Sequence, residues 1–356
     1  MPKKTLLLAL AIAAITPPVR STGKALLLLS EVLPSPVKPL HVLPAPRFST
    51  IQLADGAAEL YLGRGGNKPG IVLIHGVAPG GPADPRVRQI AGALNQLGRT
   101  VLAPSLALGE QRLDMTDTAR IRQAVDDLSE RTDGKVLILS FSFGAAFTLV
   151  ALQEEPAIQS KVLSVATVGT YFDLVHLLQG VTTGKVETAH GVADEWSPDP
   201  RAPKIVLEFL ARYLNSAEAR PLVDAYQNRD PSGLPPDARS IYDLMTNTDL
   251  RRTRALVAEL PGGLGKMIDA LSPARRMGRI QVPILAMHSR QDPASPPSES
   301  ELMVRAVRPP AEASLTLVGS FRHVTPSTGT ALLKDAGPLI LYGARVIGTQ
   351  ESWWFR

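Results

Sequence analysis

The sequence predicts an α/β protein in which helices cover both faces of a mostly parallel sheet. Short apolar runs such as residues 70–76 (GIVLIHG) and 135–140 (KVLILS) alternate along the chain with amphipathic helical segments. Continuous apolar runs are typical of strands buried on both faces, and parallel strands need helical crossovers between them. The chain has 356 residues, 44% of them hydrophobic, which is enough for one large core or for two domains.

Each expected element has a local signal of its own. Residues 47–64 predict a β-hairpin, because two strand-like runs flank an Asp55-Gly56 turn. The helix expected at 84–98 carries Val87 and Leu94 on one stripe and ends at Gly98. Further strands are expected at 70–76, 100–104, 135–140, 161–169, 282–289 and 314–319, and further helices at 117–134, 144–155 and 329–347.

Between Gly169 and Val282 the strand pattern disappears, and four short amphipathic helices are expected at 201–215, 235–247, 249–260 and 262–276. A helical block between two strands of one sheet is typical of a lid. We therefore expect four parts: a hydrophobic N-terminal segment with a Pro-rich linker at 1–46, the first part of the core at 47–170, a helical lid at 171–280, and the second part of the core at 281–356.

The N-terminal segment has two short apolar runs. Lys3 and Lys4 precede an apolar stretch at 5–15, which is too short to span a bilayer but typical of a secretory signal, with a cleavage site at Ala11-Ile12-Ala13. A second run at 25–29 suggests instead an uncleaved segment on a membrane surface. A third interpretation packs both runs on the domain itself. Export or membrane association is preferred over a cytoplasmic location.

The most informative stretch is Ser140-Phe141-Ser142-Phe143-Gly144, where an expected strand meets an expected helix. A serine on such a sharp turn is typical of a nucleophile, and it needs small neighbours two positions away so that strand and helix can approach. Gly144 meets this requirement, and Ser140 stands where glycine is commoner. The turn also directs the amide of Phe143 and the positive end of the helix towards a reacting carbonyl oxygen.

On these residues the chain resembles the α/β-hydrolases over roughly residues 47–346. The family carries its nucleophile, acid and base in the order Ser, Asp, His. The resemblance therefore implies Ser142 as nucleophile, Asp292 (in MHSRQDPASPP) as the orienting acid, and His323 (in GSFRHVTP) as the base. Serine hydroxyls need such a base near neutral pH, and a buried carboxylate fixes the tautomer of the imidazole. No cofactor is implied.

The segment IHGVAPGG at 74–81 lies where the family places its other oxyanion donor. The resemblance implies that the backbone N–H groups of Val77 and Phe143 form the oxyanion hole. It gives His75 a structural role in shaping this loop, and it puts Ser105 where the family often has aspartate.

Other candidate sites are weaker. Asp173 is a rival acid just past an earlier strand, and its alternative role is to cap the helix that follows. The chain has no cysteine, and its histidines do not pair at helical spacing, so we expect no metal site. GGLGKM is not a phosphate loop, because Met267 stands where Ser or Thr must bind magnesium. The net charge of +5 is too small to indicate nucleic acid. The basic clusters near Arg252 and Arg276 are interpreted as the solvated face of a helix in preference to a contact with anionic lipid.

The expected function is that of a serine hydrolase that cleaves carboxylic esters, with lipid-like or medium-chain acyl groups preferred, through an acyl-enzyme. The partners expected are a small-molecule ester and a membrane surface. Thioesters, lactones and amides would use the same machinery, because fold and triad do not determine the leaving group. The alternative from another class is a non-catalytic, membrane-associated binding protein with the same fold. The sequence leaves the oligomeric state open.

Overall fold

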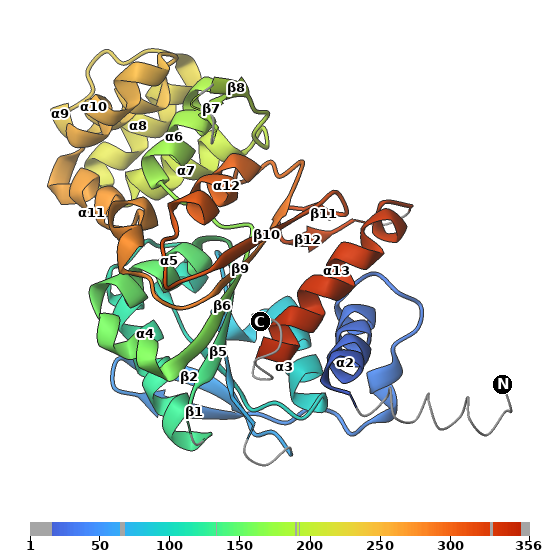
Figure 1. The fold of residues 1–356 in the computed structure, drawn as a ribbon. Helices are drawn as coiled ribbons and strands as arrows, with labels where there is room; N and C mark the ends of the chain where they lie inside the picture. The colour runs from blue at the N-terminus through green and yellow to red at the C-terminus, as the bar shows by residue number, and fades with distance from the viewer. Residues whose placement is uncertain are drawn as a thin grey trace, which may run out of the picture.

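The computed structural model describes residues 16–64, 68–132, 134–188, 191, 193–327 and 330–349. Its centre is an eight-stranded sheet in the order β1-β2-β4-β3-β5-β6-β9-β10 (Figure 1). β1 and β2 pair antiparallel, as do β2 and β4, and all later pairs are parallel. This confirms the expected mostly parallel sheet. The strands are β1 (Ser49–Leu53), β2 (Gly56–Tyr61), β3 (Ile71–Ile74), β4 (Val101–Pro104), β5 (Val136–Phe141), β6 (Val162–Val168), β9 (Ile284–Ser289) and β10 (Ala313–Val318).

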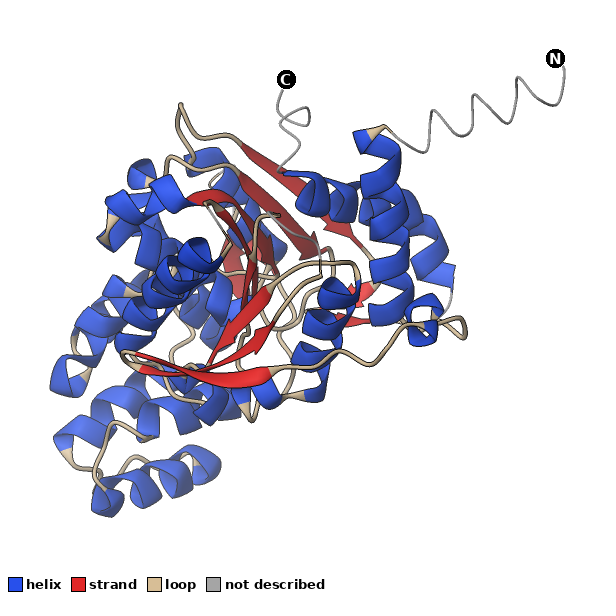
Figure 2. Cartoon of the chain, turned by 90° about the horizontal axis from the view of Figure 1, so that it is seen from below, coloured by secondary structure: helices blue, strands red, loops and turns tan. Residues whose placement is uncertain are grey.

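Helices cover both faces of the sheet, as Figure 2 shows. Two separate hydrophobic clusters result, one under each layer of helices. Four central strands, β3, β4, β5 and β6, are apolar and buried along nearly their whole length, which explains their continuous apolar sequences. One layer contains α4 (Thr116–Arg131), α5 (Ser142–Glu154) and α12 (Pro297–Ala306), and the other contains α2 (Pro17–Val32), α3 (Pro85–Gln96) and α13 (Thr330–Gly348).

Local capping explains where α3 begins and ends. The Asp84 side chain accepts a hydrogen bond of 2.8 Å from the Arg86 amide, and Pro85 occupies the first turn, where its missing N–H costs nothing. Val87 and Leu94 face the core, as their spacing predicts. The chain leaves the helix through Gly98 at a φ of +88°, a conformation that favours glycine.

A helical insertion follows β6 and precedes β9 (Figure 1). It also contains a two-stranded hairpin, β7 (Lys185–Glu187) with β8 (Ala193–Glu195), which the sequence did not predict because strands this short show no periodicity. The helices are α6 (Leu174–Thr183), α7 (Ala202–Ala211), α8 (Ser216–Asn228), α9 (Pro236–Met245), α10 (Thr253–Ala258) and α11 (Leu264–Ala270).

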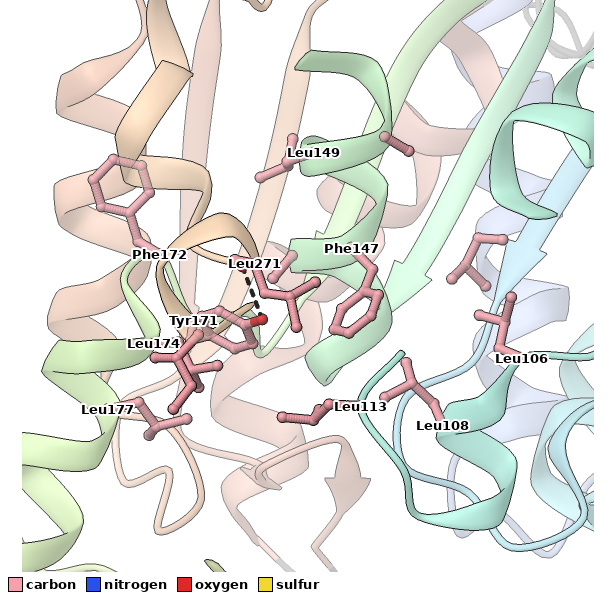
Figure 3. Packing of buried hydrophobic residues seen from close by; sticks show 14 of the residues in the cluster. Leu106, Leu108, Leu113, Phe147, Leu149, Tyr171, Phe172, Leu174, Leu177 and Leu271 are labelled. Atoms are coloured by element: carbon pink, nitrogen blue, oxygen red, sulfur yellow. Dashed lines mark hydrogen bonds between the residues drawn. The ribbon is translucent and has the colours of Figure 1, made fainter. Parts of the chain in front are cut away.

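The insertion packs directly on α5, the helix that begins at Ser142. Figure 3 shows Tyr171 and Phe172, at its start, in one apolar cluster with Phe147 of α5. The Tyr171 hydroxyl donates a hydrogen bond of 3.0 Å to the carbonyl of Leu271, at the other end of the insertion. The two ends of the insertion are therefore joined to each other and to the core.

The N-terminal segment is described from Thr16 onwards. Residues 1–15, which carry the first apolar run, lie outside the described residues. The second run forms part of α2, which packs along α13 and buries Ala25 and Leu28 in the cluster that it shares with that helix. The second run is thus packed on the domain, as the third interpretation expects of it.

Two further observations complete the fold. Helix α12 was not expected, because its buried face carries Ser298, Glu299 and Ser300 and so lacks an apolar stripe. No helix among the described residues is both long enough and apolar enough to cross a membrane.

Candidate active site

The turn from β5 into α5 holds Ser142 in a strained conformation. Its φ is +51°, which is uncommon for a residue other than glycine and is typical of functional turns. A Cβ on Gly144 would lie 2.1 Å from the carbonyl oxygen of His75, and one on Gly76 would lie 2.7 Å from the Cβ of Ser142. Both glycines are therefore required for the turn to approach the loop after β3. The Ser140 hydroxyl fits because it is buried and donates to the Ala166 carbonyl at 3.0 Å.

The structure brings together the three residues on which the sequence analysis centred. His323 Nε2 lies 2.7 Å from Ser142 Oγ, and His323 Nδ1 lies 2.8 Å from Asp292 Oδ2. A carboxylate can only accept, so Nδ1 carries the proton and Nε2 is free to accept from the serine hydroxyl. Ser142 is at the start of α5, Asp292 in the loop after β9, and His323 at the tip of a small hairpin.

The position of His323 depends on two backbone features. The hairpin consists of β11 (Phe321–Arg322) and β12 (Thr325–Pro326), and His323 has a φ of +59° in its turn. Gly169, just past β6, makes room for the imidazole, since a Cβ there would lie 3.1 Å from the ring. A larger residue at 169 would press the ring away from Ser142.

Asp292 is almost completely buried but remains ionised. Its Oδ1 accepts hydrogen bonds from the amides of Ala294 and Ser295 at 2.8 and 3.0 Å. Burial by itself would raise the pKa of the carboxyl, but hydrogen bonds from His288 and His323 outweigh it and hold that pKa well below its usual range. The imidazole of His323 therefore faces a full negative charge.

His288 is a site residue that the sequence reasoning missed, since it was set aside as a histidine that ends a strand. It is 1% exposed, and its Nε2 lies 3.3 Å from Asp292 Oδ2 and 2.9 Å from the Ser295 carbonyl. Its Nδ1 lies 2.6 Å from Ser300 Oγ, on α12. Since the carbonyl can only accept, Nε2 carries the proton and faces the carboxylate. No local signal could have found it, because His288 lies in β9 and Asp292 in the loop that follows, outside any helix.

The residues expected to supply the oxyanion hole flank the nucleophile. Phe143 lies in the first turn of α5, where backbone N–H groups have no partner within the helix, and its ring packs edge-on against Tyr171 at 4.9 Å. Val77 follows Gly76 and lines the same cavity as Ser142. His75 is buried, with Nδ1 2.7 Å from the Gly76 carbonyl, and burial lowers its pKa, so it is a neutral part of the loop.

The rival acid, Asp173, has a different role. Its Oδ1 accepts from the Val175 amide at 2.8 Å, so it caps α6, and its Oδ2 lies 3.3 Å from Arg254. These contacts confirm the capping role that the sequence left as the alternative for this residue.

A cavity of about 330 Å³ opens beside Ser142 and His323. Its surface is predominantly apolar, and its walls come from the sheet and from helices α2, α3 and α13. Within the described part of the chain, no group of three or more acidic or histidine side chains could hold a metal ion. The site therefore combines three hydrogen-bonded side chains, those of Ser142, His323 and Asp292, with an adjoining apolar cavity.

Comparisons with known proteins agree with this fold. The model of the Alpha/beta hydrolase family matches residues 71–337, which is more than half of the chain. Similar solved structures include a serine hydrolase from Cycloclasticus zankles (19% identity, 83% of this chain and 96% of that chain, TM-score 0.45). A 2-hydroxy-6-oxo-6-phenylhexa-2,4-dienoate hydrolase from Rhodococcus is also similar (19% identity, 84% and 99%, TM-score 0.44). Another is the acylaminoacyl peptidase of Pyrococcus horikoshii (11% identity, 87% and 41%, TM-score 0.49).

Comparison with curated protein sequences finds no match. The family match nevertheless covers the strands β3, β4, β5, β6, β9 and β10, the turn that holds Ser142, and the loops that hold Asp292 and His323. The chain belongs to the alpha/beta hydrolase family, and it is a hydrolase.

Proposed function

We propose that this hydrolase cleaves carboxylic esters through an acyl-enzyme formed on Ser142. The observation that supports this most directly is the hydrogen-bonded line from Ser142 Oγ through His323 to Asp292, with links of 2.7 and 2.8 Å. This is the arrangement that nucleophilic catalysis by serine requires. The strained φ of Ser142 and the buried, ionised Asp292 support the same function.

In the proposed mechanism, Ser142 Oγ attacks the acyl carbon while its proton moves to His323 Nε2. Asp292 stabilises the imidazolium that forms, and the amides of Val77 and Phe143 hold the negative charge on the carbonyl oxygen. The C–O bond to the alcohol then breaks, and His323 returns the proton to the leaving oxygen. A water molecule repeats the sequence on the acyl-enzyme, which releases the acid and restores Ser142.

The bond class and the location are parts of the proposal. Esters are preferred to amides because an alcohol is a better leaving group than an amine, and thioesters are the alternative substrates that the same triad would cleave. Export or contact with a membrane surface remains a prediction, since the residues 1–15 on which it depends lie outside the described residues.

A fluorophosphonate probe, which reacts with activated serines, tests the proposed function. We expect the wild type to be labelled and to hydrolyse p-nitrophenyl acetate, and we expect Ser142→Ala to lose both properties. Ser140→Ala is the matched control, because this serine is two residues away and hydrogen-bonds to Ala166 instead of to the imidazole. A folded wild-type protein that is not labelled would favour the non-catalytic binding protein.

A further inference from the structure

The cavity beside Ser142 runs away from the helical insertion. One end is formed by Ser142 and His323, and the interior is formed by apolar side chains at the ends of the central strands, among them Leu73, Leu139 and Met287. Those three residues belong to the cluster under α2 and α13, and the insertion packs in the cluster on the opposite face. Among the described residues that line the cavity, none comes from the insertion.

Helix α2 forms one wall of the cavity through Leu28, Leu29 and Val32. Leu339 and Val346 on α13 form the facing wall. The two helices are in close contact, since a Cβ on Gly343 would lie 3.1 Å from the Cβ of Ala25.

Polar contacts fix α2 in this place. Lys38 Nζ donates to the carbonyls of Ser30, Glu31 and Leu33 at 2.9, 2.7 and 2.9 Å, which caps the C-terminal end of the helix with a positive charge. The buried Glu31 carboxylate accepts from the Leu40 amide at 2.8 Å. Gln89 on α3 donates to the Glu31 carbonyl at 2.6 Å. These hydrogen bonds hold α2 in place as one wall of the cavity.

Three polar side chains along the cavity are engaged elsewhere. The Tyr342 hydroxyl donates to the Thr167 carbonyl at 3.2 Å, Arg86 pairs with Asp84 at 2.7 Å, and Gln89 donates to Glu31. The surface that a ligand meets beyond Ser142 and His323 is therefore predominantly hydrocarbon. A ligand that fills this cavity should gain binding energy with each buried methylene.

We propose that the cavity between α2, α13 and the sheet binds the acyl chain of the substrate, so that the substrates are esters of apolar, medium-length acyl groups. This inference rests on the proposed acyl transfer at Ser142. It makes the N-terminal helix, and not the insertion, the element that selects the acyl chain.

Wall-filling substitutions test the inference. Leu29→Trp on α2 and Val346→Trp on α13 place an indole in the cavity. We expect the wild type to prefer p-nitrophenyl octanoate over the acetate by at least about tenfold in kcat/KM, since each buried methylene favours binding. Either substitution should lower kcat/KM for the octanoate at least about tenfold more than kcat/KM for the acetate. The matched controls are Leu26→Trp and Leu341→Trp, whose residues are 49% and 45% exposed on the same helices.

Binding is measured separately from turnover, with a fluorescent medium-chain fatty acid and the Ser142→Ala protein. Leu29→Trp or Val346→Trp in this background should weaken binding at least tenfold, and the control substitutions should not. If the acetate is hydrolysed but the folded cavity variants keep the octanoate preference and fatty-acid binding, the inference is wrong. If no ester is hydrolysed but the fatty acid binds and the cavity variants abolish binding, the inference stands as a binding site and the proposed function fails.

Discussion

The substitution Asp292→Asn tests whether the Asp292 carboxylate holds His323 in the tautomer that can accept a proton from Ser142. Oδ1 accepts two backbone N–H groups, from Ala294 and Ser295, so an asparagine must direct its carbonyl oxygen there. Its NH₂ group is then left 2.8 Å from His323 Nδ1 and 3.3 Å from the protonated Nε2 of His288. His323 must move its own proton to Nε2, where it can no longer accept from Ser142.

The expected magnitude follows from this change of tautomer. A serine hydrolase with its imidazole held in the wrong tautomer loses about 10⁴-fold in kcat, which corresponds to about 5 kcal/mol. Turnover of p-nitrophenyl esters should fall by that order, with KM little changed, because the acyl cavity is untouched. Thermal unfolding in parallel checks that the variant is folded.

Asp173→Asn is the control for this experiment. Asparagine caps a helix as well as aspartate does, so α6 should keep its first turn, and what is lost is the negative charge that faces the half-exposed Arg254 and His176. We expect its turnover to match the wild type. If Asp292→Asn stays within tenfold of wild-type kcat, or if Asp173→Asn loses as much, the assignment of the acid is wrong.

Two further predictions concern packing and pH. Gly144→Ala places a Cβ 2.1 Å from the His75 carbonyl oxygen, so α5 must move away from the loop after β3. We expect the free energy of unfolding to fall by about 1–3 kcal/mol. Turnover should fall at least about 10²-fold, because Ser142 moves with the helix. Gly23→Ala in α2 is the control, since a Cβ there meets nothing within 4 Å, and it should leave the free energy of unfolding in a denaturation assay unchanged or raise it. A Gly144→Ala protein that is as stable and as active as the wild type would contradict the steric argument. Burial lowers the pKa of His176, but Glu299, Asp173 and Glu187 outweigh it and raise that pKa above the unfolded value of about 6.5. The ion pairs of His176 therefore stabilise the fold fully below about pH 6.5 and are lost as the pH rises through the folded-state pKa. In the wild type this loss should lower Tm as the pH rises above about 6.5, and His176→Gln should make that decline smaller. Identical profiles of Tm against pH for the two proteins would contradict this.

The sheet and the nucleophile turn could be predicted because their signals are local. The strands at 70–76 and 135–140 are continuous apolar runs, and the spacing of Ser140 and Gly144 around Ser142 follows from the steric demands of one turn. His323 and Asp292 required more than local reasoning, since their proximity depends on how loops from separate strands meet at one edge of the sheet.

Other features had no local signal. The contact of α2 with α13 joins residues about 300 positions apart, and an apolar run at 25–29 is equally suited to a membrane, a signal or a core. The proximity of His288 to Asp292 depends on the curl of the loop after β9, and the position of the cavity depends on both helices. Such features arise from tertiary packing, which the periodicity of one segment does not encode.

The pairing of α2 with α13 also has a consequence for biosynthesis. Helix α2 precedes α13 by about 300 residues, so the face of α2 that packs on α13 has no partner until α13 has been synthesised, even though α3 is made sooner. Contacts of such long sequence separation close slowly, because the loop entropy must be overcome first. A factor that shields α2 during synthesis, such as a chaperone, would therefore have access to this face until α13 closes the cavity beside Ser142.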